Sequence, residues 1–223
     1  MIIDLRVYTY LPSKFRKFLK GYQDEGFALT SRHLGKALGI FTSESGVQNR
    51  TFQFFMYDDS SHRYQCRVGM RSDPAWTAFI KIDGDALLQQ HNSLLEPLPD
   101  VALAIPKTAA PSRPADAVPR IFELLTFTCF PGDYRSALEL VRTERVRLLQ
   151  KHGIEIIGAF TMNTGDDNNI VMMCVYQDDL DRDVKRSALQ DDPAFQEHLT
   201  VLNPMLRQTD TTLLLATPYS PLQ

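Results

Sequence analysis

Four polar side chains in two strand-like segments are the residues of this chain best suited to chemistry. Arg6 and Tyr8 alternate along the first segment, so they project from the same face. Gln53 and Tyr57 share a face of a later segment in the same way. A guanidinium can hold a carboxylate or an enolate, and a phenol can donate or accept a proton. These residues predict the polar end of a small, partly apolar pocket.

The chain matches itself without a gap when it is displaced by about 119 residues. Gly39-Ile40-Phe41-Thr42 then falls on Gly158-Ala159-Phe160-Thr161, and Asp73-Pro74-Ala75-Trp76 falls on Asp192-Pro193-Ala194-Phe195. About 25 of about 95 paired residues are identical, and one copy is already the size of a small domain. We therefore expect a first module at 1–97, a proline- and alanine-rich linker at 98–119, and a second module at 120–218.

The second module has lost most of these polar candidates. The counterparts of Arg6, Tyr8, Glu44 and Gln53 are Leu125, Phe127, Asn163 and Met172, whereas Tyr57 is kept as Tyr176. A degenerate repeat of this kind predicts one working pocket, in the first module, and one structural partner. Neutral drift of surface positions explains the difference equally well, because fold alone does not imply function.

Some candidates recur in both modules. His33 recurs as His152, and a histidine near a helix end could act as an acid or base, so His33 joins Tyr8 and Arg6 as a candidate catalytic residue. Its retention in both copies favours a structural role at a helix C-terminus. Arg63 and Arg67 recur as Arg182 and Arg186, which predicts a structural ion pair. The candidate substrate contacts are Glu44, Gln53, Phe55, Tyr57 and Trp76, although Phe195 in place of Trp76 also fits a core position.

Each module reads as strand, helix, strand, strand, helix, strand. In the first, the expected strands are 3–10, about 38–43, 51–57 and 93–95, and helices follow Pro12, Asp59 and Asp73. Gly21 and Gly26 predict a break or bend in the first helix. This order is the ferredoxin-like arrangement, whose antiparallel sheet has helices on one face and needs cover on the other. The predicted fold class is therefore α+β, with two tandem ferredoxin-like modules whose sheets pair within one chain.

The first module resembles the NIPSNAP family. The resemblance is carried by Leu5-Arg6-Val7-Tyr8-Thr9 with Pro12, by 39–49 followed by a strand that ends at Tyr57, and by Asp73-Pro74-Ala75-Trp76. It covers nearly all of the first module and, more loosely, the second. It implies a dimeric α+β barrel, formed here inside one chain, and little about activity. Family members often place histidine and tryptophan in the central strand, where this chain has Gln53 and Phe55.

Composition excludes several classes of function. The net charge of -3 gives no footprint for nucleic acid or an anionic membrane, and no apolar run is long enough to span a bilayer. The three cysteines are unclustered, and no histidines stand at metal-ligand spacing, so neither disulfides nor a metal site is expected. We expect a cytoplasmic protein with no cofactor, a small-molecule ligand as its partner, and a homo-oligomer of these chains as an open option.

Two function hypotheses follow. The first is a pocket protein in which Arg6, Tyr8, Gln53 and Tyr57 bind an oxygenated, partly aromatic substrate, with cofactor-independent oxygenase (monooxygenase), isomerase or lyase chemistry conceivable by fold analogy. The second is a non-catalytic interaction or scaffold protein with a filled interior. A haem-binding variant is a further alternative, with His33 as the axial ligand. A cavity above about 300 Å³ beside Tyr8 and Gln53 would favour the first hypothesis.

Overall fold

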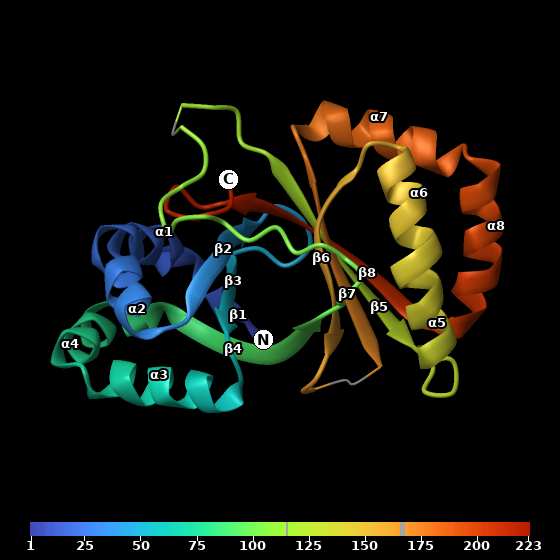
Figure 1. Cartoon of the computed structure of the whole chain (residues 1–223). Helices are drawn as coiled ribbons and strands as arrows, with labels where there is room; N and C mark the ends of the chain where they lie inside the picture. The colour runs from blue at the N-terminus through green and yellow to red at the C-terminus, as the bar shows by residue number, and fades with distance from the viewer. Residues whose placement is uncertain (115, 166–167) are drawn as a thin grey trace. The chain divides into compact units, whose positions relative to one another are not determined.

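The computed structural model describes residues 1–114, 116–165 and 168–223, which form two compact units (Figure 1). The first unit contains Met1–Leu94, Pro106–Ala117 and Ala216–Gln223, and the second contains Leu95–Ile105 and Val118–Leu215. The predicted linker therefore contributes to both units, and the last residues of the chain belong to the first unit. Position 115 of the linker lies outside the described residues, and the remainder of 98–119 contains no helix or strand.

The first unit follows the predicted order of elements. Its strands are β1 Ile2–Tyr10, β2 Lys36–Ser43, β3 Arg50–Tyr57 and β4 Leu87–Pro97, and its helices are α1 Pro12–Gly21, α2 Phe27–His33, α3 Ser60–Ser72 and α4 Pro74–Asp83. Pro12 and Pro74 stand at helix starts, where the missing N–H costs nothing. Asp59 and Asp73 cap α3 and α4 by accepting from the backbone N–H of His62 and Ala75, each at 2.8 Å.

The second unit repeats these elements. Its strands are β5 Ile121–Cys129, β6 Glu155–Met162, β7 Asn169–Tyr176 and β8 Leu206–Ala216, and its helices are α5 Tyr134–Leu140, α6 Val146–Lys151, α7 Asp179–Gln190 and α8 Pro193–Leu202. Figure 1 shows these four helices on the same side of the strands of their unit. Short 3₁₀ turns, Gly84–Ala86 and Asn203–Met205, precede β4 and β8.

The strand order is that of a closed antiparallel barrel, β1-β3-β2-β8-β5-β7-β6-β4. This order confirms the predicted fold class of two tandem modules whose sheets pair within one chain. In the first module Arg6 lies directly opposite Gln53 on neighbouring strands, and Asp4 lies opposite Phe55. The corresponding pairs in the second module are Leu125 with Met172 and Glu123 with Cys174.

The elements differ from the predictions in two places. The last strand of the first module begins at Leu87, whereas the sequence predicted a start at residue 93. The sequence did not predict the first half of this strand because Leu87–His91 are exposed and lack the apolar alternation typical of a strand. Where Gly21 and Gly26 predicted a break or bend, the chain stays helical and has one turn of π-helix, Tyr22–Gly26, between α1 and α2. A π-helical turn also stands at Val141–Arg145, between α5 and α6.

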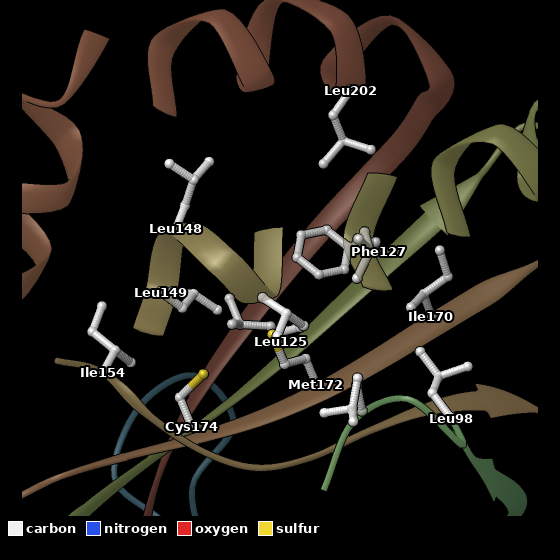
Figure 2. Close-up of a cluster of buried hydrophobic side chains, with 14 of the residues drawn as sticks. Leu98, Leu125, Phe127, Leu148, Leu149, Ile154, Ile170, Met172, Cys174 and Leu202 are labelled. Carbon is white, nitrogen blue, oxygen red and sulfur yellow. The ribbon is translucent and has the colours of Figure 1, made fainter. Parts of the chain in front are cut away.

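The two modules differ in the polarity of their helix-facing sheet residues. In the second, Leu125, Phe127 and Met172 lie in an apolar core with side chains from α6 and α8 (Figure 2). Their counterparts in the first module are Arg6, Tyr8 and Gln53, beside an aromatic cluster that includes Tyr10, Phe18 and other rings. The first module therefore has polar groups where the second has closely packed hydrocarbon.

No helix among the described residues is long and apolar enough to cross a membrane.

Candidate functional site

A cavity of about 280 Å³ lies in the first module between the sheet and the helices. Its volume is slightly below the roughly 300 Å³ that would favour a pocket protein, so size alone does not decide between a pocket protein and a filled interior. It is lined by polar groups from β1, β3, α3 and β4 and by apolar groups from α1, α3 and α4. Its polar lining residues include Arg6, Tyr8, Gln53, Arg67, Arg71 and Gln90, and its apolar ones include Phe18, Met70, Trp76, Ile80 and Leu87.

Arg6 is the most enclosed charge at the cavity, with 3% of its surface exposed. Its Nε donates to Asp4 Oδ2 at 2.9 Å and its Nη2 to the Tyr57 hydroxyl at 3.3 Å. Its guanidinium carbon lies 5.0 Å from the centre of the Phe55 ring. Burial works to lower the pKa of Arg6, but the neighbouring Tyr8 and Asp4 outweigh it and raise that pKa. Arg6 is thus a fixed cation, held in place from behind.

The Asp4 carboxylate joins three arginines. Besides Arg6 it accepts from Arg63 Nε at 2.9 Å, and Arg67 Nη1 lies 3.6 Å away. Burial raises the pKa of Asp4, and the adjacent Arg6 and Arg63 more than offset this, so the pKa is lowered and the acid stays ionised. The second module repeats the arrangement: Glu123 lies 2.7 Å from Arg182 and 3.8 Å from Arg186. The predicted structural ion pairs of Arg63 and Arg67 are confirmed.

Tyr8 and Gln53 are less firmly engaged. Burial raises the pKa of the Tyr8 phenol, and the nearby Arg6 and Arg67 oppose this shift without cancelling it. Tyr8 is therefore a protonated hydrogen-bond donor at neutral pH. The Gln53 amide donates to Thr51 at 3.4 Å, a long contact that leaves most of its hydrogen-bonding capacity for another partner.

Trp76 is a wall of the cavity rather than a core residue. It is only partly buried and stacks on Phe79 with 5.7 Å between ring centres, whereas its counterpart Phe195 is 1% exposed. The interpretation of Trp76 as core is wrong, because repeat equivalence preserves position but not depth. Since Trp76 is the one tryptophan of the sequence, its fluorescence reports on this cavity.

The remaining predicted site residues lie outside the cavity lining. Tyr57 accepts a hydrogen bond from Arg6, and the ring of Phe55 packs against the Arg6 guanidinium. Glu44 is exposed after β2. His33 Nε2 lies 2.7 Å from Asp73 Oδ2, and His152 Nε2 lies 2.8 Å from Asp192 Oδ2. Each histidine thus ties one helix end to the N-cap carboxylate of a later helix, which favours the structural role.

In the second module an arginine occupies the space between two rings. The guanidinium carbon of Arg145 lies 5.1 Å from the centre of the Phe127 ring and 5.0 Å from that of Phe195. These rings are the counterparts of Tyr8 and Trp76, which line the open cavity of the first module. Arg145 is 4% exposed, and burial lowers its pKa to about 10. Among the described residues, its Nε has no hydrogen-bond partner.

Gly26, the counterpart of Arg145, is what keeps the first cavity free of such a side chain. A β-carbon at Gly26 would lie 2.6 Å from Phe79 Cζ and 2.6 Å from Tyr22 Cδ2, so no larger residue fits without movement of these rings. In the second module the ring positions hold Val141 and His198, which are smaller. Sequence reasoning missed this exchange, together with Arg71 at the cavity; the signal was a glycine paired with an arginine across the repeat.

Comparison with known proteins places both modules in one family. The NIPSNAP family model matches residues 3–101 and again residues 122–221. A NIPSNAP domain protein from Burkholderia xenovorans is 33% identical, covering 44% of this chain and 96% of that one, with a TM-score of 0.43. A NIPSNAP family protein from Agrobacterium tumefaciens is 26% identical over 44% of this chain and 93% of its own, also with a TM-score of 0.43. No curated protein matches the chain.

A more distant likeness covers both modules together. A candidate monooxygenase from Fusobacterium nucleatum matches 96% of this chain and 91% of its own length, with a TM-score of 0.67 and 12% identity. At that identity the likeness shows a shared fold and carries no residue of a site.

Proposed function

Because the chain belongs to the NIPSNAP family and has its polar cavity in the first module, we propose that it is a small-molecule pocket protein whose ligand is oxygenated and partly aromatic. The observation that supports this most is the contrast between the modules. Arg6, Tyr8 and Gln53 line a cavity, while their counterparts Leu125, Phe127 and Met172 lie in an apolar core. Asp4 and Tyr57 hold the buried Arg6 guanidinium in place beside open space, where it can bind an anionic or oxygenated group.

The chemistry such a wall supports is stabilisation of negative charge on oxygen. Arg6 is a fixed cation, and Tyr8 is a protonated donor because burial raises the pKa of its phenol. Oxygenase, isomerase and lyase reactions of enolisable substrates share a first step, in which the substrate loses a proton and becomes a delocalised anion. Charged and hydrogen-bonding groups fixed near the oxygen of that anion lower the barrier to its formation. Neither histidine nor carboxylate stands among the described lining residues, so the proton passes to a water molecule of the solvent, and Arg6 and Tyr8 stabilise the anion that remains.

The two other hypotheses have less support. A scaffold with a filled interior does not account for the cavity. The axial ligand considered for haem, His33, is outside the cavity lining and its Nε2 is bound to Asp73.

The test uses the two changes already present in the second module, Arg6→Leu and Tyr8→Phe. A panel of small oxygenated aromatic and aliphatic compounds is screened by ligand-observed NMR and by Trp76 fluorescence, and compounds that bind are followed for turnover in air. Both variants should weaken binding or turnover at least about tenfold, which is about 1.4 kcal/mol. Arg16→Leu and Tyr64→Phe, at exposed positions of the same module, are the matched controls. Unchanged binding in both cavity variants would refute the proposed site.

A further inference from the structure

We propose that the first-module cavity takes a flat organic anion, such as an aromatic carboxylate, with its charged end at the arginines and its flat part between Tyr8 and Trp76. The inference rests on the proposed function above and adds the charge and the shape of the ligand.

The arginines of the cavity have more positive charge than Asp4 neutralises. Arg6 Nη2 lies 2.8 Å from Asp4 Oδ2, but Arg67 Nη1 lies 3.6 Å from the same atom. Arg67 Nη1 is buried and, within the described part of the chain, has no hydrogen-bond partner. Burial and the charges of Arg6 and Arg63 lower the pKa of Arg67. The counterpart Arg186 Nη1 is likewise buried without a hydrogen-bond partner among the described residues, so this donor alone does not indicate a ligand. An anion at the cavity would, however, relieve the crowding of like charges around Arg6 and Arg67.

Comparison of the modules separates structural charges from those specific to the cavity. Asp4 with Arg63 and Arg67 recurs as Glu123 with Arg182 and Arg186, so this part of the cluster belongs to the common architecture. Arg6 and Arg71 have uncharged counterparts, since Leu125 and Gln190 stand there. Both of these first-module charges line the cavity. A positive charge that lines the cavity of the first module and has no counterpart in the second is available to bind a ligand.

The shape of the ligand is indicated by the side chain that fills the second module. A guanidinium is planar, and that of Arg145 lies between the Phe127 and Phe195 rings at 5.1 and 5.0 Å from their centres. By the repeat, the corresponding place in the first module lies between Tyr8 and Trp76, which both line the cavity. A flat group fits between two rings better than a puckered one of similar volume.

The charge of the ligand must differ from that of Arg145. Aromatic faces alone would attract a cation. In the first module, however, Arg6, Arg67 and Arg71 line the same cavity and would repel one. The first-module ligand therefore shares the flatness of the Arg145 side chain and has the opposite charge.

Isothermal titration calorimetry with four matched probes tests charge and shape separately. The probes are 2-naphthoate, a flat anion; 2-naphthylmethylammonium, a flat cation; 2-naphthylmethanol, a flat neutral compound; and decahydro-2-naphthoate, an anion that is not flat. We expect 2-naphthoate to bind at least about tenfold more tightly than each of the others. Arg71→Gln should weaken 2-naphthoate binding about fivefold or more, while the exposed Arg16→Gln leaves it unchanged.

Each other outcome contradicts a defined part of the reasoning. Equal or tighter binding of the cation or the neutral probe would overturn the inferred charge, and equal binding of decahydro-2-naphthoate would overturn the inferred shape. In both cases the pocket itself would stand. If no probe binds and the compounds screened by Trp76 fluorescence also fail, this inference and the proposed function are both wrong.

Discussion

Replacement of Arg145 by methionine should stabilise the protein, although Arg145 is almost fully buried. Burial lowers the pKa of this guanidinium from its ordinary value to about 10, which corresponds to a cost of about 3 kcal/mol for keeping it charged in the folded state. Methionine keeps a long, flexible side chain and carries no charge. The contacts with Phe127 and Phe195 are lost, at about 1 kcal/mol each. The expected net gain is about 1 kcal/mol.

The sign of the effect follows from the direction of the pKa shift. A cation whose pKa is lower in the folded state than in the unfolded state destabilises the fold fully at any pH below its folded pKa. That cost begins to disappear only as the pH rises above about 10, so at pH 7 it applies in full. Arg145→Met should therefore raise the midpoint of urea unfolding at pH 7, measured by far-ultraviolet circular dichroism.

Arg147→Met is the matched control, because Arg147 is exposed on the same helical segment and pairs with Glu144 at 2.5 Å. Its effect should lie within about 0.5 kcal/mol of zero. A loss of more than about 1 kcal/mol in Arg145→Met would refute the reasoning. It would mean that the two rings stabilise the guanidinium by more than burial destabilises it.

Three further predictions concern the surroundings of Arg145 in the second module and of the cavity in the first. Burial lowers the pKa of His198 from 6.5 to about 4, so protonation of this ring destabilises the folded state. The free energy of unfolding should be highest above about pH 6.5 and fall by about 2 to 3 kcal/mol as the pH is lowered toward 4. Thermal unfolding of His198→Phe should lack that part of the pH dependence. Gly26→Ala should destabilise the first module by about 1 to 3 kcal/mol and alter the emission of Trp76, because the new methyl group displaces Tyr22 and Phe79; an unchanged spectrum and stability would contradict the contacts at Gly26. Asp4→Asn should cost about 3 to 5 kcal/mol in urea unfolding, since it leaves the buried Arg6 without its counter-ion, while Asp85→Asn at an exposed ion pair costs less than about 1 kcal/mol.

The sequence was most informative where periodicity and repetition act together. Alternation along β1 predicted that Arg6 and Tyr8 share one face, and alternation along β3 predicted the same of Gln53 and Tyr57. In the register between these strands Arg6 lies directly opposite Gln53. The ungapped repeat predicted two modules of the same element order, which the structure has. Proline and aspartate at helix starts predicted α3 and α4, because capping is a local property of the chain.

The sequence did not indicate how deeply individual side chains are buried or which residues far apart in the chain contact one another. Trp76 and Phe195 occupy equivalent positions, yet one lines a cavity and the other is core, because the side chains around them differ. The first half of β4 is exposed and lacks alternation, so no pattern marked it. Arg145 replaces Gly26 of the first module, and Val141 and His198 replace the larger Tyr22 and Phe79. The sequence shows each replacement separately, and only the structure shows that Arg145 lies against the Phe195 ring.

The placement of the C-terminal segment has a consequence for the order in which the protein is made. Thr217 N donates to Ile40 O at 2.9 Å, and the Tyr219 ring lies 5.6 Å from Tyr22 and 5.4 Å from Phe27. As the ribosome releases the chain from its N-terminus, Tyr22 and Phe27 emerge about 190 residues before Tyr219, which is many seconds at ordinary rates of synthesis. During that time the side of these rings that Tyr219 contacts in the finished fold is uncovered, while the strands and helices of the second module are being added. The module with the candidate site therefore receives Tyr219 only after the second module has been synthesised.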